Sequence, residues 1–150
     1  MLEKIKSDEK IGELIKSVFD MDLSIDGDWG YTKESATIIK RVDMPIEQLE
    51  HTVASMRTHL EMSIMCTKED RYGGINLNER DRREHHEGSQ LYHKVTYATS
   101  AIKESDYNAF IEEYKEFYGK KDFDISEYFD RRREATLNKI ETYWFEILSQ

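Results

Sequence analysis

One apolar stripe over residues 43–64 constrains the fold of this chain more than any other feature of its sequence. Six apolar side chains recur there at helical spacing: Ile46, Leu49, Val53, Met56, Leu60 and Ile64. Six polar side chains fall outside this sector of a helical projection: Glu47, Glu50, His51, Ser55, Arg57 and Thr58. Pro45 precedes the stripe, in the first turn, where a helix tolerates a missing N–H group. The pattern predicts a helix that buries its stripe and keeps these polar positions outside the buried sector.

Spacing and capping signals predict the other elements. Ser7 and Ser105 are expected helix caps, and Asp124 with Glu127 has the spacing of a capping box. Alternation and β-propensity predict the strands. The expected elements are helices over residues 7–21, 105–118 and 124–148, and strands over residues 36–42 and 91–102.

These elements predict a single domain over residues 1–150, of the α+β class. A chain of this length with 38% hydrophobic residues can bury one core. We expect a small antiparallel sheet of about three or four strands, with amphipathic helices packed on one face.

Residues 66–90 interrupt this organisation, because their apolar residues follow neither the spacing of a helix nor the alternation of a strand. Gly73 and Gly74 indicate a turn, and residues 79–87 are all charged or histidine. A segment of this length outside the core of a compact domain is either functional or disordered. We therefore expect a mobile or functional excursion over residues 66–90.

Charge is unevenly distributed along the chain, whose net charge is −9. Residues 1–50 carry seven Lys and Arg against twelve Asp and Glu, whereas residues 51–100 carry seven of each. Acidic outer thirds disfavour nucleic acid and anionic membranes, and favour a basic protein partner. No apolar run is long enough to cross a membrane, and Cys66 is the single cysteine, so we expect a cytoplasmic protein.

The neutral middle third contains the candidate ligand-binding residues. Arginine forks can bind phosphate, and histidine adds charge on protonation. The candidates are Arg71, Arg80, Arg82, Arg83, His85, His86 and His93. Glu79, Asp81 and Glu84 lie among them and can neutralise them locally. No P-loop and no Gly-x-Gly-x-x-Gly motif supports a nucleotide site, and no motif identifies a catalytic residue.

Neither a metal nor another cofactor is expected. His85, His86 and His93 are weak metal candidates, since they lack a fixed spacing such as His-Glu-x-x-His. Residues 22–33 place Asp22 and Asp26 as in a calcium loop, but Lys33 stands where a closing glutamate belongs. An Asp/Gly turn that leads into a β-hairpin is the preferred interpretation.

Two functions remain open at this point. The first is an acidic, non-enzymatic module that binds another protein as an inhibitor, antitoxin-like or regulatory factor. The alternative is a small ligand-binding protein or enzyme that acts on a phosphorylated or nucleotide ligand through residues 71–93. The first leads because catalytic signatures are missing, and a homodimer is left open.

Overall fold

A computed structural model describes residues 2–149 and confirms the α+β class. In chain order the elements are α1 (Ile11–Phe19), β1 (Ile25–Gly27), β2 (Thr37–Ile39), α2 (Ile46–His59), the π-helical turn η1 (Leu60–Ile64), β3 (Tyr72–Glu87), β4 (Gln90–Lys103), α3 (Glu104–Phe117), α4 (Ile125–Ala135) and β5 (Thr136–Ile147). The strands form one sheet in the order β1-β2-β5-β4-β3. Strands β2 and β5 pair in parallel, and the other neighbours pair antiparallel.

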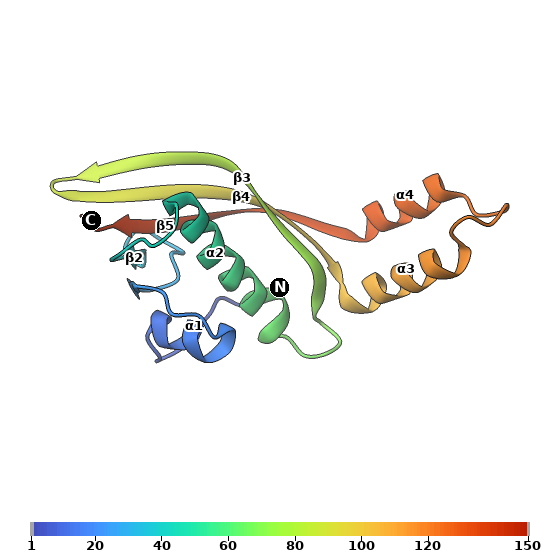
Figure 1. The fold of residues 1–150 in the computed structure, drawn as a ribbon, viewed down its shortest axis with the longest axis horizontal. Helices are drawn as coiled ribbons and strands as arrows, with labels where there is room; N and C mark the ends of the chain where they lie inside the picture. Colours follow the sequence, from blue (N-terminus) through green and yellow to red (C-terminus); the bar gives the residue numbers. More distant parts are fainter. Residues whose placement is uncertain (1, 150) are drawn as a thin grey trace.

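The sheet is therefore larger than predicted, with five strands of mixed direction instead of three or four antiparallel ones. The difference comes from β3 and β5, two segments that the sequence did not identify as strands. Helices α1 and α2 lie against the body of the sheet, whereas α3 and α4 lie beyond it, at the far end of the long strands (Figure 1). The prediction that the helices pack on one face of the sheet therefore holds for α1 and α2 but not for α3 and α4.

The core forms where α1 and α2 meet the inner face of β4 and β5. The predicted stripe is confirmed at Leu49, Val53, Met56 and Leu60, which are at most 5% exposed. They pack with residues of α1 and of the two central strands, namely Ile11, Ile15, Val95, Tyr97, Tyr143 and Phe145. Ile64 is 46% exposed instead, because the helix widens into η1 and ends there.

Three of the polar positions on α2 are also buried, against expectation. Glu50 and Thr58 are fully buried, and Arg57 is 2% exposed. Partners outside the helix cover this side of it: Arg82 reaches Glu50, and Tyr143 reaches Thr58. The buried apolar side chains of α2 were predicted correctly, but the buried face of the helix is wider and includes these polar side chains.

Most of the predicted excursion over residues 66–90 is strand β3. It pairs with β4 from Tyr72 to Glu87, and a tight turn containing Gly88 at φ 59° connects the two strands. An antiparallel ladder needs only backbone groups, so β3 forms without an apolar face. Its many charged side chains suit an edge strand, because they discourage pairing with another chain. The mobility or function of the segment stays a prediction.

Limited proteolysis can test the order of β3. We expect trypsin to cut first at Lys120 or Lys121, which are exposed in the turn between α3 and α4. Arg82 and Arg83 lie in the paired ladder, so their cleavage requires local opening of the sheet. Mass spectrometry of the earliest fragments gives the order of cleavage. First cuts at Arg82 or Arg83 would show that the β3 ladder opens more easily than the turn.

The predicted final helix divides into two elements. Asp124 caps α4, since its carboxylate accepts the Glu127 N–H at 3.1 Å, as the capping-box spacing predicted. The helix ends at Ala135, and β5 continues as a central strand between β2 and β4. By contrast, Ser7 and Ser105 do not cap helices: α1 begins at Ile11 and α3 at Glu104.

None of the helices within residues 2–149 has the length and apolar content that crossing a membrane requires.

Candidate functional site

Two of the predicted ligand-binding residues meet inside the protein, at Glu50. The Glu50 carboxylate lies 2.6 Å from Arg82 Nη1 and 2.7 Å from His93 Nδ1. Arg82 also donates two hydrogen bonds to Glu79, and His93 Nε2 lies 3.7 Å from Glu84. Arg82 and His93 are therefore already engaged by carboxylates.

The other predicted residues are spread along β3. Arg83 pairs with Asp81 at 3.0 Å, and His86 Nε2 lies 3.6 Å from Glu84. His85 packs beside Trp144, with ring centroids 5.2 Å apart. Arg80 is exposed beside Asn78 and Ala98, and Arg71 lies just before the strand. Phosphate or nucleotide binding by this set stays a prediction.

Among the weak metal candidates, His86 and His93 both lie beside Glu84, whereas Asp22 and Asp26 have other partners. Asp22 pairs with Lys16 at 2.9 Å, and Asp26 accepts the N–H of Gly27. A hairpin is present as β1 and β2, but Asp26 and Gly27 belong to its first strand and not to a turn that precedes it. Within residues 2–149, no three His, Cys, Asp or Glu side chains are grouped so that they could hold a metal ion.

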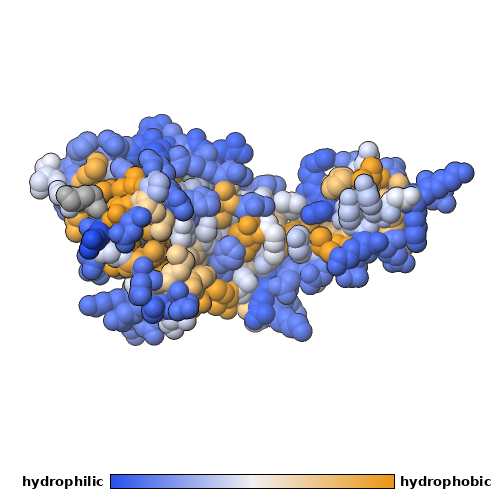
Figure 2. Space-filling view, viewed as in Figure 1, coloured by the Kyte–Doolittle hydropathy of each residue, from blue (hydrophilic) through white to orange (hydrophobic). Residues whose placement is uncertain are grey.

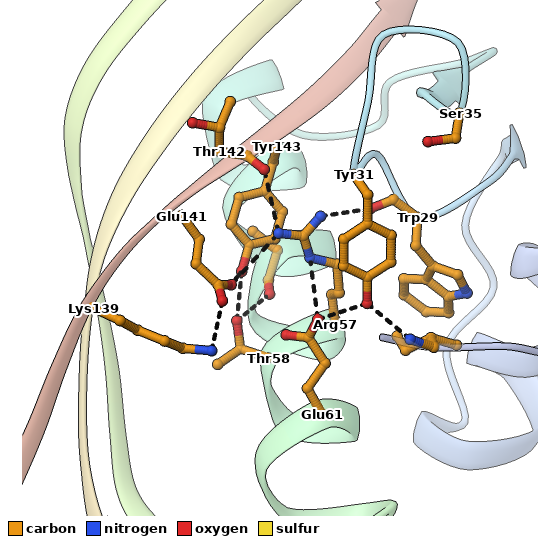
Figure 3. Close-up of polar contacts among 12 residues, drawn as sticks. Trp29, Tyr31, Ser35, Arg57, Thr58, Glu61, Lys139, Glu141, Thr142 and Tyr143 are labelled. Atoms are coloured by element: carbon orange, nitrogen blue, oxygen red, sulfur yellow. Dashed lines mark hydrogen bonds and ion pairs between the residues drawn. The ribbon is translucent and has the colours of Figure 1, made fainter. Parts of the chain in front are cut away.

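A second buried cluster, which the sequence did not reveal, surrounds Arg57. We call it the Arg57 cluster; it comprises Tyr31, Arg57, Thr58, Glu61, Lys139, Glu141 and Tyr143. Helix α2 and η1 supply Arg57, Thr58 and Glu61, strand β5 supplies Lys139, Glu141 and Tyr143, and the loop after β1 supplies Tyr31 (Figure 3). Three separate parts of the chain thus converge on one guanidinium.

The Arg57 guanidinium lies between two aromatic rings. Its Cζ is 4.2 Å from the Tyr31 ring centroid and 3.4 Å from that of Tyr143 (Figure 3). Its terminal nitrogens donate to the carbonyls of Trp29 at 3.1 Å and Thr142 at 3.3 Å. Stacking and carbonyl contacts of this kind suit a planar guanidinium and could not be reproduced by lysine.

Two glutamates balance this buried cation. Glu141 Oε2 lies 3.5 Å from Arg57 Nη2, and Glu61 Oε2 lies 4.0 Å from Arg57 Nε. The Tyr31 hydroxyl donates to Glu61 Oε2 at 2.6 Å and accepts the N–H of Ile5 at 2.9 Å. Glu61 is 6% exposed, and its Oε1 has no hydrogen-bond partner in the described part of the chain.

Burial changes the acidity of the groups in this cluster. Desolvation raises the pKa of the Glu61 carboxyl, although the Tyr31 hydrogen bond and Arg57 oppose this rise. Desolvation also raises the pKa of Tyr143 to about 12, and burial together with Glu61 raises the pKa of Tyr31. Both tyrosines are therefore neutral hydrogen-bonding groups at physiological pH.

Gly30 lets the loop approach β5 closely enough to complete the cluster. Its φ is 76°, and a Cβ at this position would lie 2.6 Å from the Trp144 carbonyl oxygen. The Gly30 carbonyl accepts the Trp144 N–H at 2.9 Å, which fixes the loop to the strand. Only glycine adopts this conformation without strain, so Gly30 places the Trp29 carbonyl and the Tyr31 ring on Arg57.

A pocket of about 740 Å³ opens beside the Arg57 cluster. Glu61, Lys139 and Glu141 form its inner wall, and it extends between η1 and the N-terminal residues Leu2 and Glu3. Glu61 belongs to the π-helical turn, where the Met65 N–H donates to the Leu60 carbonyl at 2.9 Å. Such turns are often found at functional sites. The pocket combines a concave surface with buried charged groups, so we take it as the candidate binding site in place of the arginines of β3.

The raised pKa of Glu61 gives a pH-dependent prediction for Glu61→Gln. In the folded protein the carboxyl keeps its proton at pH values where the unfolded chain has lost it. The stability that Glu61 contributes is therefore present at low pH and falls as pH rises above about 4.3, the ordinary value for glutamate. Glutamine does not titrate, so the wild type should lose stability relative to Glu61→Gln between pH 5 and pH 8.

Urea unfolding of both proteins at pH 5, 6.5 and 8 measures this difference. Glu47→Gln, an exposed position on the same helix, controls for the general effect of losing one negative charge. A stability difference that stays constant across this range would contradict a raised pKa of the Glu61 carboxyl.

Comparison of the chain with protein-family models, with curated proteins and with solved structures finds no match.

Proposed function

We propose that the chain is a non-enzymatic interaction module that binds another protein through the helical hairpin of α3 and α4. We call this hairpin, residues 104–135, the arm. An inhibitor, an antitoxin-like protein or a regulatory factor would work in this way. Three observations support the proposal: a small core fixes the conformation of the arm, large apolar side chains on the arm are exposed, and its net charge is negative.

A small core of its own orders the arm. Tyr128 is fully buried, its ring lies against those of Phe110 and Phe123, and its hydroxyl donates to the Phe110 carbonyl at 2.7 Å. Arg131 joins the two helices, since it donates to both oxygens of Glu113 and lies on the Phe110 and Tyr128 rings. A preordered element loses little entropy when it binds a partner.

Large apolar side chains on the arm remain exposed, and this observation carries the proposal. Phe117, Tyr118, Ile125 and Phe129 are between 40% and 59% exposed. Apolar patches are visible on the arm among hydrophilic surface (Figure 2). Rigid aromatic side chains are the residues that most often anchor protein interfaces.

The charge of the arm specifies the kind of partner. Residues 104–135 carry six Lys and Arg against ten Asp and Glu. Apolar anchors surrounded by net negative charge complement a partner surface that is apolar at its centre and basic at its rim. A membrane or nucleic acid would meet repulsion from the same charges.

Site-specific photo-crosslinking in cells that express the chain tests this function. A photoreactive phenylalanine replaces Tyr118 in one variant and Ile140 in the other, because these side chains are similarly exposed, at 59% and 66%. Ile140 lies outside the arm, in β5, where it pairs with Ala98 of β4. We expect a discrete protein adduct from position 118 that weakens with added salt, and none from position 140.

The identity of the adduct decides the outcome. A single basic protein crosslinked at position 118, and lost on Phe129→Ser, supports the module. No adduct from position 118, or the same adducts from both positions, would contradict it.

A further inference from the structure

We propose that the 740 Å³ pocket beside the Arg57 cluster binds a small molecule that carries a primary ammonium group on an apolar body. This site is separate from the arm, so the inference does not depend on the proposed protein partner. It rests on three features of the pocket: its size and lining, a hydrogen-bond acceptor without a donor, and an excess of carboxylates.

The pocket has the size and lining of a small-molecule site. Ligand pockets commonly measure about 300–1,000 Å³, and they combine apolar walls with a few polar groups. Here Leu2, Met65, Leu137 and Tyr72 supply apolar and aromatic surface. The apolar part of a ligand can lie against these side chains while its polar group reaches the inner wall.

The inner wall lacks one hydrogen-bond donor. Lys139 is held by Glu141 at 2.6 Å, and Lys103 lies 3.6 Å from Asp70. Glu61 receives a hydrogen bond from Tyr31 on Oε2, but its Oε1 receives none within residues 2–149. The terminal nitrogens of Arg57 donate to backbone carbonyls, and its Nε, which also has no hydrogen-bond partner among the described residues, lies 4.0 Å from Glu61 Oε2, beyond hydrogen-bond distance.

A donor from the pocket can reach this oxygen. Glu61 lines the pocket, but its Oε1 is covered by neighbouring atoms, so a ligand reaches this oxygen by rotation about the terminal torsion, which is broad for glutamate. A buried acceptor without a donor destabilises the protein, and a ligand that satisfies it recovers this loss.

Charge favours an ammonium over a neutral donor. The pocket is lined by four carboxylates, Glu3, Glu61, Asp70 and Glu141, and by two lysines. Arg57 lies beside Glu61 and Glu141, so three cations face four carboxylates and one negative charge remains in excess. Both lysines already lie beside a carboxylate. A positively charged donor therefore gains from the excess negative charge, whereas a hydroxyl of the same shape does not. A bound water molecule is the alternative way to satisfy Glu61.

Calorimetric titration of the full chain with n-hexylamine and with 1-hexanol tests the proposal. The two probes share a carbon chain and differ in the terminal group, so their comparison isolates the ammonium. We expect the amine to bind at least tenfold more tightly than the alcohol, and Glu61→Gln to abolish this preference. Glu47→Gln, an exposed position on the same helix, should retain it.

A measurement on the wild type keeps the test independent of whether Glu61→Gln folds. In spectra of the methionine methyl groups, the amine should shift Met65, which lines the pocket, and leave Met21 and Met44 unchanged. Equal affinity for both probes, no binding of the amine at millimolar concentration, or shifts at Met21 and Met44 alone would overturn the proposal.

Discussion

Arg57→Ala is expected to lower the free energy of unfolding by about 3–5 kcal/mol, the usual cost of removing one partner from a buried ion pair. The variant leaves Glu61 and Glu141 without their shared cation and removes two hydrogen bonds to backbone carbonyls. It also removes the group that fills the space between the Tyr31 and Tyr143 rings. Chemical denaturation at pH 7, with the thermal midpoint as a second readout, measures the loss.

Two further variants separate this effect from a general loss of charge. Arg133→Ala removes an arginine whose side chain is 75% exposed and paired with Asp130, so its midpoint should change little. Arg57→Lys keeps the charge but cannot contact both rings and both carbonyls, so it should recover only part of the stability. A midpoint for Arg57→Ala as high as that for Arg133→Ala would show that the buried cluster does not stabilise the fold.

The parts of the fold that could be predicted are those in which one face is apolar. The stripe of α2 identified its buried residues because each of them packs on the sheet. The alternation of β4 was equally clear, with Val95, Tyr97 and Thr99 on the buried face. Local periodicity reports burial, and it succeeds where burial decides the structure.

Strands β3 and β5 could not be recognised by that signal. Strand β3 has few buried side chains and exists through its backbone ladder with β4, which leaves no apolar period. In β5, Leu137, Ile140, Trp144 and Ile147 also have helical spacing, and this pattern competed with the strand. The β-branched and aromatic residues of 136–147 were the available signal, and they favoured a strand.

The Arg57 cluster was missed for a related reason. Arg57 and Glu61 are four residues apart on a helix, the spacing of an ordinary exposed ion pair. Only the strand assignment of β5 places Tyr143 and Glu141 opposite them. A site assembled from three distant segments requires the topology, and the sequence alone did not provide it.

Glu50→Ala should be as destabilising as Arg57→Ala, with a loss of about 3–5 kcal/mol. Glu50 is fully buried, and its two oxygens hold Arg82 Nη1 at 2.6 Å and His93 Nδ1 at 2.7 Å. The variant removes the Nδ1 partner of the buried His93 and leaves the partly buried Arg82 with Glu79 alone. Glu50→Gln keeps one acceptor oxygen, so its loss should be smaller. Urea unfolding at pH 7 measures both.

The same variant should loosen the edge of the sheet, because the Glu50–Arg82 pair ties α2 to β3 across 32 residues of sequence. Apart from Leu77, β3 adds no apolar side chain to the core, so this pair is a main link between the strand and the helix. Hydrogen exchange of residues 79–87 should therefore accelerate in Glu50→Ala. Glu84→Ala, which removes a 61% exposed carboxylate on the outer side of His93, should leave exchange and stability nearly unchanged. Equal effects of Glu50→Ala and Glu84→Ala on exchange and stability would contradict this role of Glu50. They would mean that the buried Glu50–Arg82 pair holds β3 to α2 no better than an exposed carboxylate does.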